Sequence, residues 1–334
     1  MDFLTKIKDL FRKDKVSLGL DIGTATVKLV KLKFTKEGAV ELLAFAVKPS
    51  LKELSADTDV KQVNVSISGT SAIIRYITFP KMSPQELKQA LKFEAQKYIP
   101  FPVAELNLGS VILKDDLPDN KMLVLLAAVR KEILSQRVKA LDEFGLQARL
   151  IDIDSLALIN AFNFNYPPQA DPKNKSPALL NIGASFSNLN ILEDGIPRLS
   201  RDIHIAGNNF TQKIADTLGM EFLAAEELKL NPDQESLSKI TVLAEGSAAS
   251  LVSEIRTSFD YYESQGASSV GKIYLSGEGS ILSGLKEALA SLLGIEVEYW
   301  NPLAKINLSP GIDAGKLKGH LAQLPVAVGL ALRP

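Results

Sequence analysis

Two stretches of the sequence, about half the chain apart, share one pattern of apolar and polar positions. In the first, an apolar run over Val16–Ile22 ends at Gly23, an alternating run over Thr26–Phe34 ends near a Glu-Gly pair, and a third run covers Val40–Val47. An alternating run that stops at a turn pair is typical of a β-hairpin. The pattern therefore predicts a three-stranded antiparallel meander.

The second stretch repeats this order of runs and turns. Ala178–Ile182 is apolar and ends at Gly183, Ser187–Leu192 alternates and ends at an Asp-Gly pair, and Ile196–Ile203 follows. The letters also agree, with LDIGTAT in the first stretch and LNIGASF in the second. A repeat of run, turn and second turn together predicts two related domains that begin with the same meander.

Between the two meanders the pattern predicts a compact insert of strands and helices. One helix is expected to begin after Ser83, because Ser83 can cap it, Pro84 suits its first position and Glu86 completes the capping pattern. It ends at the Pro100–Pro102 break. The other expected elements of this region are the strands Gln62–Ser68, Ala72–Phe79, Leu106–Leu113, Met122–Val129 and Gln147–Ile153 and the helices Lys131–Phe144 and Ser155–Phe164.

A loop with four prolines, Tyr166–Pro177, is predicted to be the hinge between the two halves. After the second meander, a predicted strand at Lys272–Leu275 runs into a Ser-Gly-Glu-Gly turn. Helices of the second half are expected at Gly207–Leu218, Ala224–Leu230, Leu237–Ser264, Leu282–Leu293 and Leu324–Leu332.

The composition excludes several classes of site. Of the 334 residues, 46% are hydrophobic and 23% are charged, and the formal net charge is −1, so bulk binding to nucleic acid is not expected. There is no cysteine, which excludes disulfides and thiolate metal sites. The only histidines, His204 and His320, are far apart in sequence, so neither a zinc site nor a histidine-based triad is expected. The longest apolar runs, Leu123–Val129 and Leu324–Leu332, are much shorter than the ~20 residues of a membrane span.

The amino-terminal segment 1–15 is charged throughout and has no secretory apolar core, so a cytoplasmic protein is expected. Phe3, Ile7, Leu10 and Phe11 recur at helical intervals among basic residues. One interpretation is a short basic amphipathic helix that touches a membrane or a partner. The other, which is favoured, is a terminus that docks on its own domain.

The candidate chemistry lies in tight turns, because the sequence has neither a P-loop nor a G-x-G-x-x-G fingerprint. Gly23 allows a sharp bend in which backbone amides can converge on an anion. Lys28 can add a positive charge to a bound phosphate, and Asp21 can hold a hydrated Mg²⁺. A plain hairpin with a solvated lysine is the alternative, which this turn by itself favours. The converging amides would belong to Thr24, Ala25 and Thr26.

A second turn at 181–185 can contact the same phosphates from the opposite side. A third, after the strand at Lys272–Leu275, lies where backbone must approach a ligand or bend tightly. Each turn alone is weak evidence, and it is the order of the three turns along the chain that indicates a shared binding site. The candidate residues of the second and third turns are Gly183, Ala184, Ser185, Gly277, Glu278 and Gly279.

This ordered trio resembles the superfamily of actin, sugar kinases and heat-shock-protein ATPases. DIGTATVK and NIGASFSN look like its two phosphate motifs, and SGEGSILSGL looks like its adenosine motif. The spacing from Asp21 to Lys28 matches the first phosphate hairpin of actin. The resemblance implies an α/β protein of the actin-like ATPase fold, with two related domains around a nucleotide cleft and with ATP and Mg²⁺ as cofactors.

A narrower resemblance, to the PilM family of type IV pilus assembly, covers almost the whole chain. It rests on FPKMSPQELKQALKFEAQKYIPFP, LVLLAAVRKEIL and GLQARLIDIDSLALINAF, and then on AGNNFTQKIA, AAEELK and AVGLALRP. The related cell-division protein FtsA carries a linker and a membrane-targeting amphipathic helix after the fold. No such segment follows Pro334 in this sequence, so we expect a PilM-type rather than an FtsA-type protein.

The family resemblance also implies a set of nucleotide contacts. Asp152, on the strand that connects the halves, is expected to help order Mg²⁺-bound water. For Glu226 and Lys229 the alternative is a solvated helix face. The implied adenosine contacts lie near Gly207, Asn208, Asn209, Glu226, Lys229, Gly277 and Gly279.

The implied division into subdomains follows the FtsA-like plan, with an insert in the first half. After the segment 1–15, the expected parts are 16–80 (1A), 81–152 (the insert, 1C), a connecting helix and linker at 153–177, 178–222 with 271–323 (2A), 223–270 (2B), and a helix at 324–334 that returns to 1A.

Two positions depart from the superfamily pattern. The second phosphate hairpin usually begins with Asp, where this chain has Asn181, whose amide has no negative charge and cannot act as a base. Glu278 replaces the commoner Gly beside the adenosine site. These changes favour ATP binding over hydrolysis, so at most a slow ATPase is expected.

The resemblance implies a scaffold at the cytoplasmic face of the inner membrane, in type IV pilus assembly or a related secretion system. It would recruit the cytoplasmic amino-terminal tail of a PilN-like membrane protein. The groove is expected between the first subdomain and the insert, beside Tyr98, Ile99 and Phe101, where two prolines fix an extended segment. Two alternatives stay open: a small-molecule kinase, for which the second domain lacks a DxG carboxylate, and a filament-forming FtsA-like protein.

Overall fold

The computed structural model describes residues 14–56, 61–168, 175–266 and 268–334. The basic helix expected at 1–15 therefore lies outside the described residues, apart from positions 14 and 15. The middle of the predicted proline-rich hinge lies outside them as well.

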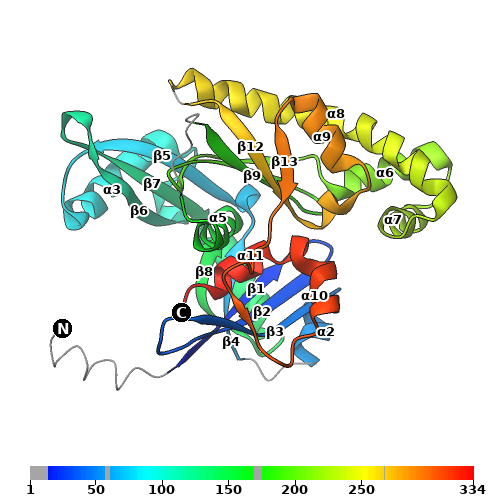
Figure 1. Ribbon diagram of the computed structural model, residues 1–334. Coiled ribbons are helices and arrows are strands. Elements are labelled where there is room, and N and C mark those ends of the chain that lie inside the picture. The colour runs from blue at the N-terminus through cyan, green and yellow to red at the C-terminus, as the bar shows by residue number, and fades with distance from the viewer. Residues whose placement is uncertain (1–13, 57–60, 169–174, 267) are drawn as a thin grey trace.

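Two mixed sheets with the same strand order form the two halves of the molecule (Figure 1). In each, three antiparallel strands form a meander, and two further strands extend the sheet in parallel from the first of the three. The order is β3-β2-β1-β4-β8 in the first sheet and β11-β10-β9-β12-β13 in the second. The matching orders confirm the repeat that the sequence predicts.

The strand bounds agree closely with the sequence prediction. The first sheet contains β1 (Lys15–Ile22), β2 (Val27–Phe34), β3 (Val40–Lys48), β4 (Gln62–Ile67), β8 (Gln147–Ile153) and, at the β3 edge, β14 (Asn307–Leu308). The second contains β9 (Ser176–Ile182), β10 (Ser187–Glu193), β11 (Ile196–Ile203), β12 (Val270–Ser276) and β13 (Glu296–Tyr299).

The helices also follow the prediction, except for the short ones. The sequence pattern missed α2, α10, β13 and β14, because each spans too few residues to show a period. The helices of the described residues are α2 (Leu51–Ala56), α3 (Pro84–Tyr98), α4 (Lys131–Asp142), α5 (Asp154–Asn165), α6 (Gly207–Leu218), α7 (Phe222–Leu230), α8 (Gln234–Ser264), α9 (Leu285–Leu293), α10 (Ala314–His320) and α11 (Pro325–Ala331).

Helices α5 and α11 pack against each other between the two sheets (Figure 1). A Cβ atom at Gly329 would lie 1.7 Å from the carbonyl oxygen of Ala157 on α5. A Cβ atom at Gly19 on β1 would lie 2.0 Å from the carbonyl oxygen of Ala327 on α11. Only glycine at these two positions allows α11 to lie this close to both neighbours.

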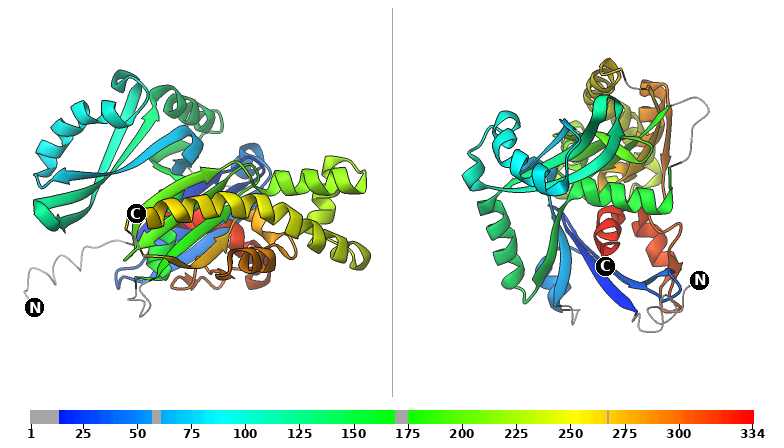
Figure 2. Two further views of the ribbon diagram at one scale, coloured as in Figure 1. Left: turned by 90° about the horizontal axis from the view of Figure 1, so that it is seen from above. Right: turned by 90° about the vertical axis from the view of Figure 1, so that its left-hand side faces the viewer.

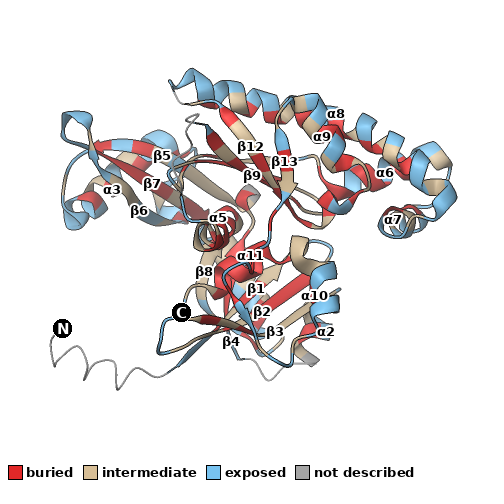
Figure 3. Ribbon diagram, viewed as in Figure 1, coloured by how far each residue is buried: buried red, intermediate tan, exposed pale blue. Residues whose placement is uncertain are grey.

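Both sheets bury side chains against this helix pair. One hydrophobic cluster joins α5 and α11 with Val30 and Leu32 of β2, Leu179 of β9 and Leu192 of β10. Figure 3 shows the same distribution, with buried residues concentrated in the sheets and in α5 and α11 and exposed residues on the outer side of α8. The helix pair therefore belongs to the core of both halves.

The insert forms a separate lobe beside the two sheets (Figure 2). Its three strands lie in the order β5-β7-β6, with β5 at Ala72–Pro80, β6 at Leu106–Leu117 and β7 at Lys121–Arg130. Helix α3 covers one face of this sheet through its buried side chains. The predicted start of α3 is confirmed, because the Ser83 hydroxyl accepts from the Glu86 amide and the Glu86 carboxylate accepts from the Ser83 amide.

A chain of hydrogen bonds ties the insert to the second half. The Tyr76 hydroxyl on β5 lies 2.7 Å from the Ser200 hydroxyl on β11, which donates to Asn190 on β10 at 2.7 Å. Burial raises the pKa of Tyr76 to about 12, so its hydroxyl stays protonated. The insert sheet is thereby fixed to the meander that carries the second glycine turn.

We expect Gly329→Ala to lower the free energy of unfolding by roughly 2 kcal/mol or more, because its methyl group would overlap the Ala157 carbonyl and force the helices apart. Urea denaturation measures this change. Gly246→Ala is the matched control, since this exposed glycine of α8 has open space around an added Cβ. The control should gain about 0.5–1 kcal/mol, because alanine favours the helix. A Gly329→Ala protein as stable as the wild type would contradict the close packing.

Candidate functional site

The first glycine turn joins β1 to β2 as the sequence predicts. The Gly23 amide donates to the Thr26 carbonyl at 3.1 Å and closes the turn. A Cβ atom at Gly23 would lie 2.9 Å from that carbonyl oxygen and 3.0 Å from the Lys28 Nζ atom. The turn therefore needs glycine, and it brings the backbone close to the Lys28 amine.

Lys28 is buried at the base of this turn and faces two carboxylates. Its Nζ atom lies 3.6 Å from Asp21 Oδ2, across the β1–β2 pair, and 3.8 Å from Glu278 Oε2. Burial by itself lowers the pKa of Lys28, but these two carboxylates outweigh it and raise the pKa, so the amine stays charged. The alternative of a solvated Lys28 is wrong, because the residue is only 7% exposed.

The second and third glycine turns meet at the start of α6. The Gly207 amide donates to the Gly183 carbonyl at 3.0 Å, and the Asn208 amide donates to the Ala184 carbonyl at 2.8 Å. A Cβ atom at Gly279 would lie 2.6 Å from the Gly183 carbonyl oxygen. Three backbone segments far apart in sequence thus approach one another where side chains do not fit.

The turns of the two halves also contact each other. The Thr24 and Ser185 hydroxyls lie 2.9 Å apart, and the Asn208 side chain donates to Ser185 at 3.4 Å. The Thr26 hydroxyl donates to the Glu278 carboxylate at 2.7 Å. The structure therefore brings the predicted turn residues of both halves into contact with one another.

Glu226 and Lys229 lie beside the start of α6. The Lys229 amine donates to Glu226 at 2.6 Å, to the Thr211 hydroxyl at 2.8 Å and to the Gly207 carbonyl at 3.4 Å. Lys229 is 5% exposed, so the alternative of a solvated helix face is wrong for this residue. The pair borders the same cleft as the glycine turns.

Asn181 ends β9 at the second turn and is already engaged within its own half. Its side-chain oxygen accepts a hydrogen bond from the Ser276 hydroxyl at 3.0 Å. An amide here supplies hydrogen-bonding capacity without charge.

Asp152, which was expected to help order Mg²⁺-bound water, is engaged by the end of the chain. Its Oδ2 atom lies 2.8 Å from the Arg333 guanidinium in an ion pair. Asp152 pairs in register with Ser66 of β4, and Asn64 of the same strand face donates to the Leu330 and Arg333 carbonyls. The alternation of side chains along β8 therefore directs Asp152 toward the end of the chain.

Asp154, two residues later, is the carboxylate that the sequence analysis missed. It begins α5 directly after the carboxyl end of β8. Burial, together with a smaller effect of the charge of Asp21, raises the pKa of Asp154 to about 7. Burial also raises the pKa of Asp21, against the effect of Lys28. A carboxylate directly after a parallel strand was the signal available in the sequence.

The residues at the cleft fit a nucleotide with a hydrated divalent cation. Close glycine turns and a buried lysine suit phosphate groups, and Asp21 and Asp154 suit a cation that keeps several waters. Within the described parts of the chain, no group of three His, Cys, Asp or Glu side chains is placed to hold a metal ion.

The segment predicted to line a partner groove divides into buried and exposed residues. Ile99 is 3% exposed and packs in the insert core, so its predicted place in the groove is wrong. Tyr98 and Phe101 are 38% and 39% exposed, and the Arg130 guanidinium lies 5.8 Å from the centre of the Phe101 ring. The helix buries Ile99 because it continues the apolar stripe of α3.

A surface cavity of about 540 Å³ lies next to this segment, between the start of β6 and α4. Asn107 of β6 lines it together with residues of α4, which are Lys131, Leu134, Ser135, Val138, Lys139 and Asp142. Lys131 also donates to the Ala104 carbonyl at 2.8 Å, just after the proline segment. β6 is an edge strand of the insert sheet.

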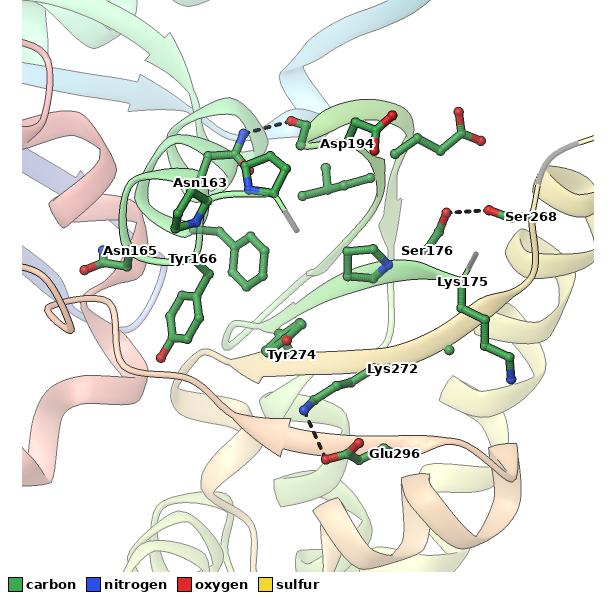
Figure 4. Close-up of a pocket in the computed structure, with 18 of the residues that line it drawn as sticks. Asn163, Asn165, Tyr166, Lys175, Ser176, Asp194, Ser268, Lys272, Tyr274 and Glu296 are labelled. Carbon is green, nitrogen blue, oxygen red and sulfur yellow. Dashed lines mark hydrogen bonds and ion pairs between the residues drawn. The ribbon is translucent and has the colours of Figure 1, made fainter. Parts of the chain in front are cut away.

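A larger cavity, of about 960 Å³, lies at the other end of the second sheet (Figure 4). It borders the first residues of β9 and β12, whereas the glycine turns follow their carboxyl ends. Its Lys272 already pairs with Glu296 at 3.0 Å and Glu298 at 2.7 Å. Ligands of parallel sheets bind beyond the carboxyl ends of the strands, so this cavity is not the candidate site.

Comparison with known proteins agrees with the fold and the family expected from the sequence. The family described as type IV pilus assembly protein PilM matches residues 44–334. A solved structure of a PilM–PilN type IV pilus biogenesis complex is 28% identical, covers 95% of this chain and 98% of its own, and has a TM-score of 0.81.

Two other relatives are more distant. The ethanolamine utilization protein EutJ of Carboxydothermus hydrogenoformans is 14% identical over 97% of this chain and 91% of its own, with a TM-score of 0.55, and shows the fold alone. The chaperone protein dnaK of Cyanophora paradoxa is 31% identical over 90 residues, which are 25% of this chain and only 15% of the chaperone. In the part of the chain that the structure describes, no helix is long and apolar enough to cross a membrane.

Asp154 should make stability depend on pH. Because its folded pKa of about 7 lies above its ordinary value, its contribution to stability is present below about pH 4 and is lost as the pH rises through 7. In EDTA, we expect Asp154→Asn to have a higher melting temperature than the wild type at pH 8 and nearly the same one at pH 4. Asp260→Asn, which removes an exposed carboxylate of α8, is the control and should follow the wild type. Parallel curves for Asp154→Asn and the wild type would show that Asp154 is not desolvated.

Proposed function

The chain belongs to the PilM family of type IV pilus assembly proteins, and we propose that it is an ATP-binding scaffold that holds the cytoplasmic tail of a PilN-like membrane protein. The observation that carries this proposal is the likeness, over nearly the whole of both chains, to a PilM in complex with PilN. The actin-like ATPase fold, with two related halves around the cleft, agrees with it.

The nucleotide would lie in the cleft between the two glycine turns. Amides of the turns at 24–26 and 184–185, with the Lys28 amine, would contact the phosphates. Glu226 and Lys229 would border the adenosine with the backbone of Gly207 and Gly279, whose lack of a side chain lets these segments pack against the second turn. Asp21 and Asp154 would hold the water of a bound Mg²⁺, which would supply positive charge to the phosphates.

Binding rather than rapid turnover agrees with the residues of the second turn. Asn181 brings no charge and is bonded to Ser276. A small-molecule kinase needs a carboxylate beside an acceptor hydroxyl, and at the start of the second turn this chain has Asn181 in place of the usual Asp. The proposed protein is therefore a scaffold, with at most slow ATP hydrolysis.

The partner peptide would lie along β6 beside α4. An edge strand offers free backbone donors and acceptors to an extended peptide, and side pockets select its side chains. The adjoining cavity offers Leu134 and Val138 to apolar side chains and Lys139 and Asp142 to charged ones. Phe101 would contact the peptide at the end of this cavity nearest Arg130. Such an interaction would place the protein at the cytoplasmic face of the inner membrane through its partner.

Lys28→Ala should weaken the binding of Mg²⁺·ATP by one to two decades, because charge-assisted contacts contribute roughly 1.5–3 kcal/mol each. Isothermal calorimetry measures the affinity. Lys31→Ala, on the same strand three residues further along, is the matched control and should bind as the wild type does. Equal affinities of Lys28→Ala and Lys31→Ala would contradict the assignment of the first turn to the nucleotide site.

A synthetic peptide of the PilN-like tail from the same genome should bind with a Kd on the order of 1 μM or better. Phe101→Ala should weaken this binding by about tenfold, because an exposed aromatic ring at an interface contributes strongly. Fluorescence anisotropy measures the affinity, and ATP binding and the melting temperature should change little.

Ile99→Ala is the contrasting variant. Because Ile99 is buried in the insert core, this change should lower the melting temperature. A wild type that does not bind the peptide would contradict the scaffold role, and a collapse of the melting temperature in Phe101→Ala would assign that residue to the core.

A further inference from the structure

Glu278 reaches from the second half across the cleft to the first glycine turn. It follows Gly277, whose φ is 92° and at which an added Cβ would lie 2.1 Å from the Ile182 carbonyl oxygen. The backbone at this point is therefore held tightly against β9, and the direction of the next side chain is constrained with it. The Glu278 side chain is 16% exposed.

The groups that Glu278 contacts are the side-chain donors of the first turn. One carboxylate oxygen, Oε2, accepts from the Thr26 hydroxyl at 2.7 Å and lies 3.8 Å from the Lys28 amine. These are the hydroxyl and the amine through which that turn would hold an anion. A phosphate group and the Glu278 carboxylate therefore need the same donors.

The charges around Lys28 are mostly negative. Asp21 lies 3.6 Å from its amine, and Asp154 is close enough for the charge of Asp21 to act on it. Arg137 of α4 adds a weaker positive effect at both aspartates. An anion that enters this site meets repulsion from Glu278 and Asp21 unless a cation accompanies it.

We infer that Glu278 is a built-in anion that competes with the phosphates of the nucleotide for Thr26 and Lys28. Its negative charge selects for a nucleotide that arrives with a divalent cation. Because Glu278 belongs to the second half and Thr26 to the first, its displacement also breaks a contact between the halves. This inference rests on the proposed nucleotide site and assigns a specificity-determining residue within it.

The test compares the full-length wild type with Glu278→Gln, which keeps an oxygen acceptor for Thr26 but removes the charge. Calorimetric titrations with ATP are made with Mg²⁺ and with EDTA, and pyrophosphate is titrated separately. We expect Glu278→Gln to bind Mg²⁺·ATP about tenfold more tightly than the wild type. For ATP in EDTA, the affinity of Glu278→Gln should exceed that of the wild type by a larger factor. Glu287→Gln on α9 is the matched control, because it makes the same charge change at a carboxylate whose side chain is 68% exposed. It should leave both affinities unchanged, and melting curves of all three proteins establish that they are folded.

Equal or weaker ATP binding by Glu278→Gln would overturn the inference, while ATP binding by the wild type would leave the proposed function intact. An equal gain in Glu287→Gln would also overturn it, since the effect would then come from net charge. If no protein binds ATP but Glu278→Gln binds pyrophosphate more tightly than the wild type, the proposed function fails and the competition stands. If neither ligand binds any of the folded proteins, both fail.

Discussion

The close crossing of α11 with α5 and β1 is the constraint on which the rest of the molecule depends. Gly19 and Gly329 allow backbone-to-backbone contact at this crossing, and any larger residue would separate the layers. β1 carries Asp21 just before the first glycine turn, and α5 begins at Asp154. The same packing that joins the two sheets therefore also sets the relative position of the two carboxylates of the cleft.

Buried charged side chains make part of the contact between the two halves. Lys28 is held by Asp21 of its own sheet and by Glu278 of the other, and Thr24 meets Ser185 across the same gap. Burying such charges costs free energy unless each one is paired. The pairs formed here hold the side chains in one arrangement. A ligand that replaces one partner changes the contact between the halves directly, so the proposed phosphate binding and the domain arrangement would depend on the same side chains.

The insert connects this cleft with the surface where a partner peptide is proposed to bind. Tyr76 on β5 reaches Asn190 on β10 through Ser200, and β10 begins just after the second glycine turn. β5 and β6 are the two edges of one small sheet joined by β7. The strand edge proposed for the peptide is thus connected to the second glycine turn through the insert sheet, this chain of hydrogen bonds and β10.

The sequence by itself determined what depends on neighbours along the chain. Alternation and glycine turns gave both meanders, and the spacing from Asp21 to Lys28 placed them opposite each other in one hairpin. Tertiary structure decided the surroundings of residues that are close in sequence. Asp152 pairs with Arg333, while Asp154 lies within reach of the charge of Asp21, and Ile99 is core although Phe101 is exposed. Local spacing fixes the direction of a side chain within its own element, but burial and partners come from elements that are distant in sequence and meet only when the layers pack.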